Sequence, residues 1–314
     1  MKLATGVTDY IAFKQALGLR YRTDAYVLKA FCRALGDSDL AAVPLAGVEA
    51  FLSGRGTVTS AWHKKFEILN RCYRFALGRG WVSTVPLPRI LPPQPPPCPP
   101  YIYTRDELGR LLAVTETLQS PTSPLQAITF RTLWLLLYGT GLRISEALAL
   151  RLVDVDLQDS LLTIHRSKFY KTRWVPTGLK LTAQLADYAQ QRRRLPCPAG
   201  DTSTFFATRT GRPLSYRRVQ KVFQRLRQQA GICRHDGARY QPRLHDIRHT
   251  AAGHHLTAWY RDGADVQHLL PQLATYLGHV ELVSTQRYLS LTPELLEHAN
   301  RRFEHYAFAE NDHG

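Results

Sequence analysis

Residues 86–100 read PLPRILPPQPPPCPP, and this stretch decides how the chain can fold. Proline lacks the backbone N–H donor and keeps the preceding residue out of the helical conformation, so neither a helix nor a central strand can form here. We expect an extended polyproline spacer rather than a ligand for an SH3-like domain, because a chain of 314 residues needs a linker. The sequence therefore predicts a first domain over 1–85, a linker over 86–100 and a second domain over 101–314.

The first predicted domain has a helical pattern throughout. We expect helices over residues 7–17, 48–52 and 60–77, where apolar residues recur at helical spacing. A further helix is expected to begin at Thr23 and Asp24, which are both good N-cap residues. These four helices predict an all-helical domain.

The second predicted domain combines helices with one pair of strands. Thr104 and Glu107 have the spacing of a capping box and predict a helix start. Residues 160–164 and 173–175 have strand character, with Lys168 in the turn between them. The remaining segments are helical, so the predicted fold class is mainly α with a small antiparallel β-sheet (α+β).

The charge of the chain favours a polyanionic partner. There are 41 lysines and arginines against 25 aspartates and glutamates, a formal net charge of +16. Such an excess is typical of nucleic-acid-binding proteins, although solubility or attachment to a membrane surface can also explain it. No apolar run approaches the roughly 18 residues that a membrane span needs, so no membrane partner is expected.

The cysteines indicate a reducing compartment. Their number is odd, none forms a CxxC pair, and no signal peptide is evident, so we expect free thiols in the cytosol. They are Cys32, Cys72, Cys98, Cys197 and Cys233.

Three short strings in the second domain carry arginines and histidines. They read TGLRISEAL at residues 140–148, LHDIRHT at 244–250 and LGH at 277–279. Taken alone, Arg143 and Glu146 at i, i+3 would be an ordinary surface ion pair. Guanidinium groups nevertheless offer a planar fork that suits phosphate oxygens.

The second string has two interpretations. His245 and Arg248 lie one helical turn apart and can point into one pocket. His245 and His249 could instead bind zinc, as in a metal-dependent hydrolase. That string lacks the glutamate of the HExxH motif, and no third ligand stands out in the sequence.

Taken together, and with Tyr288 placed nine residues after His279, the three strings resemble the active-site boxes of the tyrosine recombinases, the phage integrase family. The resemblance covers nearly the whole chain and includes the turn with Lys168. The interval between Arg248 and His279 is longer than the family usually shows. The string around residues 273–280 looks more like transposon-associated members than chromosome-dimer resolvases.

The resemblance implies a site-specific recombinase or integrase that cleaves and rejoins double-stranded DNA through a 3′-phosphotyrosyl link. It implies a homotetramer on two paired sites, no metal or other cofactor, and a cytoplasmic, nucleoid-associated location. Implied roles are phosphate binding by Arg143, Arg248 and His279, phosphate positioning or proton acceptance by His245, protonation of the leaving 5′ oxygen by Lys168, and nucleophilic attack by Tyr288.

Two alternative functions are compatible with the same fold. A type IB topoisomerase would relax supercoils without a second site, but the LGH box and the compact length favour the recombinase. A catalytically silent DNA-binding protein of the same fold would not need the intact set of arginines, histidines and tyrosine.

Cations outside the boxes are candidates for DNA contacts, although each set could also be a solvated face. They are Lys64, Lys65, Arg71, Arg74, Lys171, Arg173, Arg217, Arg218 and Lys221.

The end of the chain predicts one more amphipathic helix. Its apolar residues must be buried, either on the same domain or in a neighbouring subunit. They are Leu295, Leu296, Ala299, Phe303 and Ala307.

Overall fold

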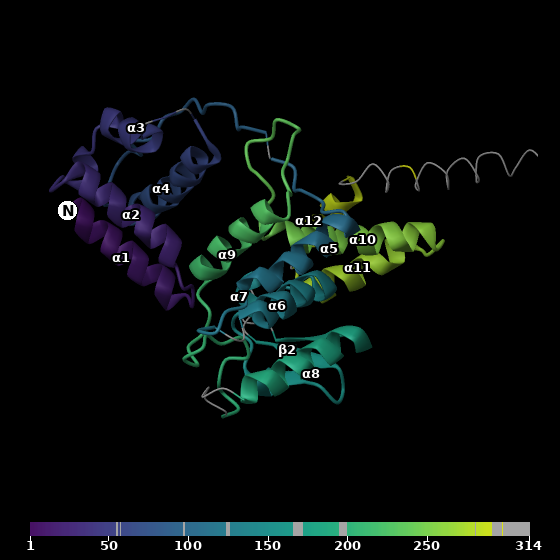
Figure 1. Cartoon of the computed structure of the whole chain (residues 1–314). Coiled ribbons are helices and arrows are strands. Elements are labelled where there is room, and N and C mark those ends of the chain that lie inside the picture. The colour runs from purple at the N-terminus through teal and green to yellow at the C-terminus, as the bar shows by residue number, and fades with distance from the viewer. Residues whose placement is uncertain are drawn as a thin grey trace, which may run out of the picture. The chain divides into compact units, whose positions relative to one another are not determined.

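The computed structural model describes residues 1–54, 56, 58–96, 98–123, 126–165, 172–194, 200–279, 281–290 and 297. The chain divides into two compact units, Met1–Pro97 and Cys98–Gly314 (Figure 1). The division falls inside the proline-rich stretch, whose described residues belong to no helix or strand.

The first unit is helical. Its helices are α1 (Leu3–Ala16), α2 (Arg22–Leu35), the short 3-10 helix η1 (Leu40–Ala42), α3 (Leu45–Ser53) and α4 (Ser60–Gly78). Apolar faces from all four α-helices meet in one core, in which Leu28, Val48 and Ile68 are fully buried. Burial of such side chains contributes about 1.5–3 kcal/mol each to folding.

The start of α2 differs from the prediction. The helix begins at Arg22, after Tyr21 with a left-handed backbone at φ 44°, so Thr23 is not its cap. Asp24 lies in the first turn instead, where a carboxylate interacts favourably with the helix dipole. It also accepts a hydrogen bond from Arg71 of α4 at 3.0 Å, which explains why the residue type suits this position.

The second unit opens with the predicted capping box at Thr104 and Glu107, which begins α5. It contains a three-stranded antiparallel sheet in the order β1–β2–β3 and helices on both sides of α6. Its elements are α5 (Arg105–Ala113), η2 (Val114–Leu118), α6 (Gln126–Thr140), α7 (Ile144–Ala147), η3 (Leu152–Asp154), β1 (Val155–Asp156), β2 (Leu161–Ile164), β3 (Arg173–Pro176), α8 (Leu179–Arg193), α9 (Tyr216–Gln229), α10 (Asp246–Arg261), α11 (Val266–Leu277), α12 (Val283–Gln286) and η4 (Arg287–Ser290).

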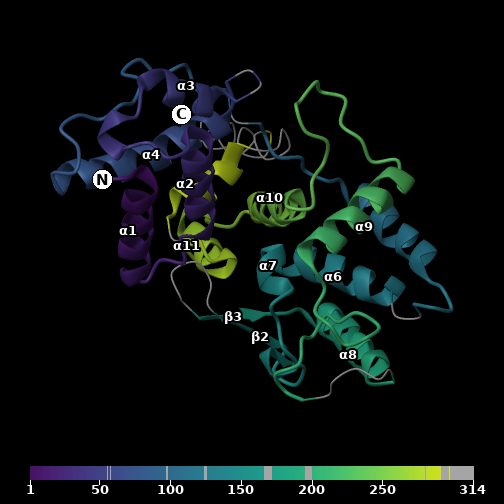
Figure 2. The ribbon, with the colours of Figure 1, turned by 90° about the vertical axis from the view of Figure 1, so that its left-hand side faces the viewer.

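Helix α6 is the centre of the second unit. It contacts α10 on one side and α8 on the other, as Figures 1 and 2 both show. Because it is covered on both sides, its residues Phe130, Leu133 and Leu137 are buried. The sheet adds Leu162 and Val175, which pair across β2 and β3 and face the same core. The predicted fold class, mainly α with a small antiparallel sheet, is confirmed.

A separate apolar cluster lies along α10 and α11. Leu256, Leu270, Leu273 and Leu277 are buried there together with Tyr288. The cluster therefore holds the segment that carries Tyr288 against these two helices. Among the described residues, no helix combines the length and the apolar character that a membrane span requires.

Two threonines of α10 allow a matched test of how the second unit is held together. The hydroxyl of Thr250 donates to the carbonyl of Asp246 at 2.8 Å and accepts the Tyr103 N–H at 3.0 Å. Thr250→Val leaves that buried N–H unpaired, which should lower the free energy of unfolding by about 1–3 kcal/mol.

Thr257→Val is the control on the same helix. Its buried hydroxyl has no hydrogen-bond partner among the described residues, so removing it should be neutral or stabilising. Denaturant unfolding of both variants checks the pair. Equal loss of stability in the two would show that the Tyr103–Thr250 hydrogen bond is unimportant.

Candidate active site

Gly141 and Arg143 form the turn that leads into α7. Gly141 has φ +60°, and a Cβ atom there would lie 2.6 Å from Leu277, so the position requires glycine. Arg143 is the N-cap of α7 and donates from its backbone N–H and from Nη1 to the two oxygens of Glu146, at 3.0 and 2.9 Å. The Glu146 side chain is only 8% exposed. The pair is therefore part of the interior and not a solvated surface pair.

The end of α11 supplies acceptors for two of the predicted arginines. Arg143 donates from Nη2 to the carbonyl of Gly278 at 3.0 Å, and Arg248 donates to the carbonyls of Leu277 and Gly141 at 2.8 and 2.6 Å. Arg248 is almost fully buried. Burial and the nearby charge of Arg143 lower its pKa to about 10, so it still carries its charge at neutral pH.

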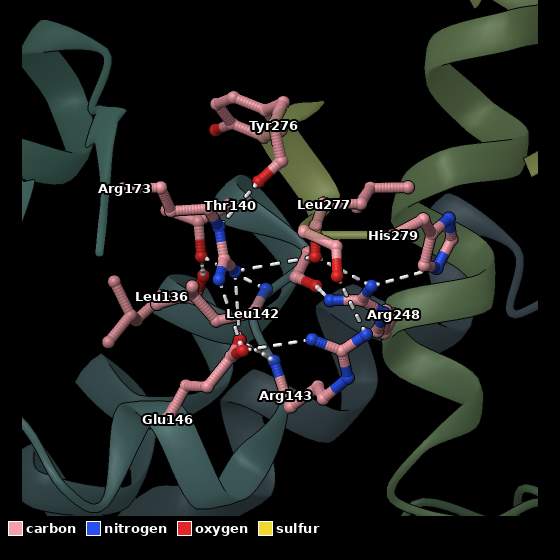
Figure 3. A network of polar contacts seen from close by, with 12 residues as sticks. Leu136, Thr140, Leu142, Arg143, Glu146, Arg173, Arg248, Tyr276, Leu277 and His279 are labelled. Atoms are coloured by element: carbon pink, nitrogen blue, oxygen red, sulfur yellow. Dashed lines mark hydrogen bonds and ion pairs between the residues drawn. The ribbon is translucent and has the colours of Figure 1, made fainter. Parts of the chain in front are cut away.

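His279 has a defined tautomer in this network (Figure 3). Its Nε2 lies 2.9 Å from Nη2 of Arg248. Its Nδ1 lies 2.7 Å from the hydroxyl of Thr285. A guanidinium can only donate, so Nε2 accepts and the neutral ring carries its proton on Nδ1. Burial, followed by repulsion from Arg248 and Arg143, lowers the pKa of His279 to about 4.

Tyr288 lies in η4, and its ring is buried between two histidines. The ring centroids are 6.0 Å from His279 and 5.5 Å from His249. Burial raises the pKa of the Tyr288 hydroxyl, and the positive charges of Arg248 and Arg143 oppose that rise. The predicted nucleophile Tyr288 thus lies next to His279 and Arg248, two of the predicted phosphate ligands.

His245 is placed directly before α10 and its side chain reaches the surface. Its ring lies 4.8 Å from that of His249. Partial burial of its ring, and then repulsion from Arg248, lower the pKa of His245. Protonation of this imidazole is therefore disfavoured in the free protein.

The zinc interpretation gains no further ligand from the structure. Asp246, next to His245, accepts two hydrogen bonds from the Arg243 side chain and one from its backbone. Across the ranges given above, no group of three histidine, cysteine, aspartate or glutamate side chains could hold a metal ion.

Two residues near Tyr288 were not among the predicted site residues. His249 was considered only as a zinc ligand, yet its ring contacts Tyr288 and its buried Nδ1 has no hydrogen-bond partner within the described part of the chain. Thr285 is fully buried and holds His279. The available signals were the i+4 spacing of His249 from His245 and a polar residue three positions before Tyr288.

Of the predicted residues in and beside the β-turn, the structure describes only Arg173. Lys168 and Lys171 lie outside the described residues, so their predictions stay predictions. Arg173 is only 10% exposed, and its guanidinium nitrogens donate to Glu146 and to carbonyls at the end of α11. The prediction that Arg173 contacts the DNA backbone is therefore wrong for this structure, because its donors are used inside the protein.

The other predicted DNA contacts lie on α4 and α9. Lys64 and Arg74 are exposed on α4, and Arg217, Arg218 and Lys221 are exposed on the first turns of α9. Lys65 is half-buried and donates to the carbonyl of Phe51 at 2.7 Å, while Arg71 forms its ion pair with Asp24. The predicted terminal helix lies outside the described residues.

Comparison with known proteins agrees with this constellation. The profile of the phage integrase family matches residues 102–294. The chain is 34% identical to "Putative integrase/recombinase y4rB" of Sinorhizobium fredii, covering 95% of this chain and 96% of that protein. It is 31% identical to the tyrosine recombinase XerC of Oceanobacillus iheyensis, covering 89% and 87%.

Solved structures show the same fold. The integrase of the Tn1549 transposon, in complex with transposon right-end DNA, matches with a TM-score of 0.70 at 16% identity, over 98% of this chain and 100% of that chain. A lambda integrase tetramer bound to a Holliday junction matches with a TM-score of 0.65 at 17% identity, over 92% and 77%. The order of the boxes, their convergence in space and these similarities show that the chain belongs to the phage integrase family, the tyrosine recombinases.

Proposed function

We propose that this protein is a site-specific tyrosine recombinase that cleaves and rejoins double-stranded DNA through a 3′-phosphotyrosyl intermediate. The observation that carries the proposal is the convergence of Arg143, Arg248, His279 and Tyr288 from four separate segments. Two guanidinium groups beside a buried tyrosine suit attack on a phosphodiester. Family membership supports the same activity.

The cleavage step follows from these positions. The Tyr288 hydroxyl gives up its proton, for which His245 is the candidate acceptor, and its oxygen forms a bond to phosphorus. The bond to the 5′ oxygen breaks, and that oxygen leaves as a hydroxyl after taking a proton from Lys168. The forks of Arg143 and Arg248 stabilise the charge that builds on the non-bridging oxygens. The new phosphodiester resembles the one broken, so the reverse step rejoins DNA without an energy source. The full set of catalytic residues is Arg143, Lys168, His245, Arg248, His279 and Tyr288.

The histidines adjust the protonation of the site. In the free protein Nε2 of His279 is an acceptor, occupied by Arg248. A bound phosphate attracts Arg248 away from Nε2 of His279. Its negative charge also favours protonation of Nε2, which can then donate a hydrogen bond to the phosphate. His245, at the surface end of α10, positions the phosphate or accepts the Tyr288 proton.

We further propose that the enzyme acts as a homotetramer on two paired sites, in the cytoplasm at the nucleoid, and belongs to a mobile element. The tetramer on DNA reported for lambda integrase supports the first point, and the Tn1549 integrase supports the last. Cations on both units would grip the duplex: Lys64 and Arg74 on α4, and Arg217, Arg218 and Lys221 on α9.

Removing the Tyr288 oxygen should abolish covalent attachment and leave DNA binding intact. Tyr288→Phe keeps the ring that packs against His279 and His249. The test incubates both proteins with a nicked duplex taken from the DNA that flanks the gene, followed by a denaturing gel. A covalent adduct with Tyr288→Phe would exclude this residue as the nucleophile.

The same assay separates the alternative functions. Relaxation of a supercoiled plasmid that lacks the site would indicate a topoisomerase. Site binding by the wild type without any adduct would indicate a silent accessory protein.

His279 should stay neutral in the free protein well below the ordinary histidine pKa of about 6.5. Its pKa of about 4 means that the stability contributed by the neutral ring is present above about pH 6.5 and is lost as the pH falls toward 4. An NMR titration, with the resonance assigned by comparison with His279→Gln, checks this. A midpoint near 6.5 would contradict the burial and charge argument.

Binding should weaken steeply with salt, with log K falling by roughly 0.9 per phosphate contact for each unit of log salt. Replacing Lys64, Arg74, Arg217, Arg218 and Lys221 by glutamine should flatten that slope. The control replaces Lys2 and Arg261, exposed cations that already pair with aspartates. Equal slopes for wild type and the five-residue variant would show that DNA is gripped elsewhere.

A further inference from the structure

Arg173, the first residue of β3, makes a two-point contact with Glu146. Its Nη1 lies 3.1 Å from Oε1 and its Nη2 lies 2.9 Å from Oε2. Parallel hydrogen bonds of this kind fix the orientation of both groups, which a lysine in the same place could not do. The contact is buried, because the two side chains are 10% and 8% exposed.

The same guanidinium also holds the end of α11. Its Nε donates to the carbonyl of Tyr276 at 3.2 Å, and Nη2 donates to that of Leu277 at 3.3 Å. It lies so close to Gly278 that a Cβ atom there would be 2.6 Å from Nη1. Arg173 therefore joins three segments that are far apart in sequence, as Figure 3 shows: β3, α7 and the turn before His279.

Both anchors of Arg143 depend on these contacts. The Arg143 guanidinium donates to Oε1 of Glu146 and to the carbonyl of Gly278. Arg173 donates to the same Oε1 and packs against the same Gly278. Although burial opposes its ionisation, the hydrogen bonds and charge of Arg173, with those of Arg143, keep the pKa of Glu146 below its ordinary value. The carboxylate thus stays charged between the two arginines.

We propose that Arg173 is a positioning residue of the recombinase: it holds Glu146 and the Leu277–Gly278 backbone in place so that Arg143 faces the scissile phosphate. The inference rests on the proposed function. It assigns Arg173 a role inside the protein, acting through Arg143.

The test compares Arg173→Met and Arg173→Lys with the wild type on the nicked duplex. Arg173→Met should slow adduct formation by about 100-fold, the effect of a misplacement of about 1 Å in a catalytic group. Arg173→Lys keeps the charge and the stem and should recover part of the rate. Site affinity should stay within about threefold of the wild type, because Arg173 donates inside the protein.

Arg151→Met is the matched control. Arg151 forms the same kind of two-point contact with Asp154, at 3.1 and 2.9 Å, away from the proposed site. The Arg151→Met variant should form the covalent adduct at the wild-type rate. Its melting temperature, measured beside those of the Arg173 variants, shows what the loss of a two-point arginine–carboxylate contact does to stability; here the carboxylate is 4% exposed and the arginine 40% exposed.

Two modified substrates show how Arg173 acts. A methylphosphonate at the mapped cleavage position lacks the negative charge that Arg143 neutralises, so the defect of the Arg173 variants should shrink on it. A 5′-bridging phosphorothiolate has a leaving group that needs no proton from Lys168, so on it the defect should persist. The reverse pattern would mean that Arg173 acts through the lysine turn and would overturn the proposal.

Other outcomes are equally decisive. Wild-type cleavage by Arg173→Met, or lost site affinity with normal cleavage of bound DNA, would also overturn it. If Arg173→Met does not fold, the same comparisons are made with Arg173→Lys. Failure of the wild type itself to form an adduct would instead contradict the proposed function.

Discussion

Three arginines that donate to one helix end, two of which also share one carboxylate, are the constraint on which the site depends. Arg143 and Arg173 both donate to Glu146, and Arg143, Arg173 and Arg248 all donate to the carbonyls of Leu277 or Gly278. Like charges at such distances repel each other, so the arrangement needs carbonyl dipoles and a buried carboxylate to hold it.

The balance of charge makes the site suitable for the proposed phosphate. One carboxylate cannot neutralise three guanidinium groups, so excess positive charge remains in a region with little water. Burial, and after it the repulsion from this excess charge, depresses the pKa values of Arg248 and His279, to about 10 and about 4. A phosphate diester, the proposed substrate, would relieve the repulsion on entering.

Much of the fold could be predicted from local patterns. The capping box at Thr104 and Glu107, the strands and the helical first unit follow from propensity and spacing. The predictions that were wrong concern positions where distant segments decide. Thr23 is a good cap by residue type, but α2 begins before it. Arg173 follows a lysine-rich turn, which suggested an exposed side chain. Its guanidinium is instead buried against α7 and α11.

By itself, the sequence determined the identities and order of the chemical groups, because short strings such as LHDIRHT and LGH carry them at fixed spacing. It also predicted a break in the proline-rich stretch, since a run of prolines permits neither a helix nor a central strand. Only the tertiary structure decided which groups meet. His249 packs on Tyr288, Thr285 orients His279, and Arg173 donates hydrogen bonds to Glu146. The reason is that the contacts of the site join residues up to 135 positions apart, and their geometry depends on how α7, α11 and β3 pack together.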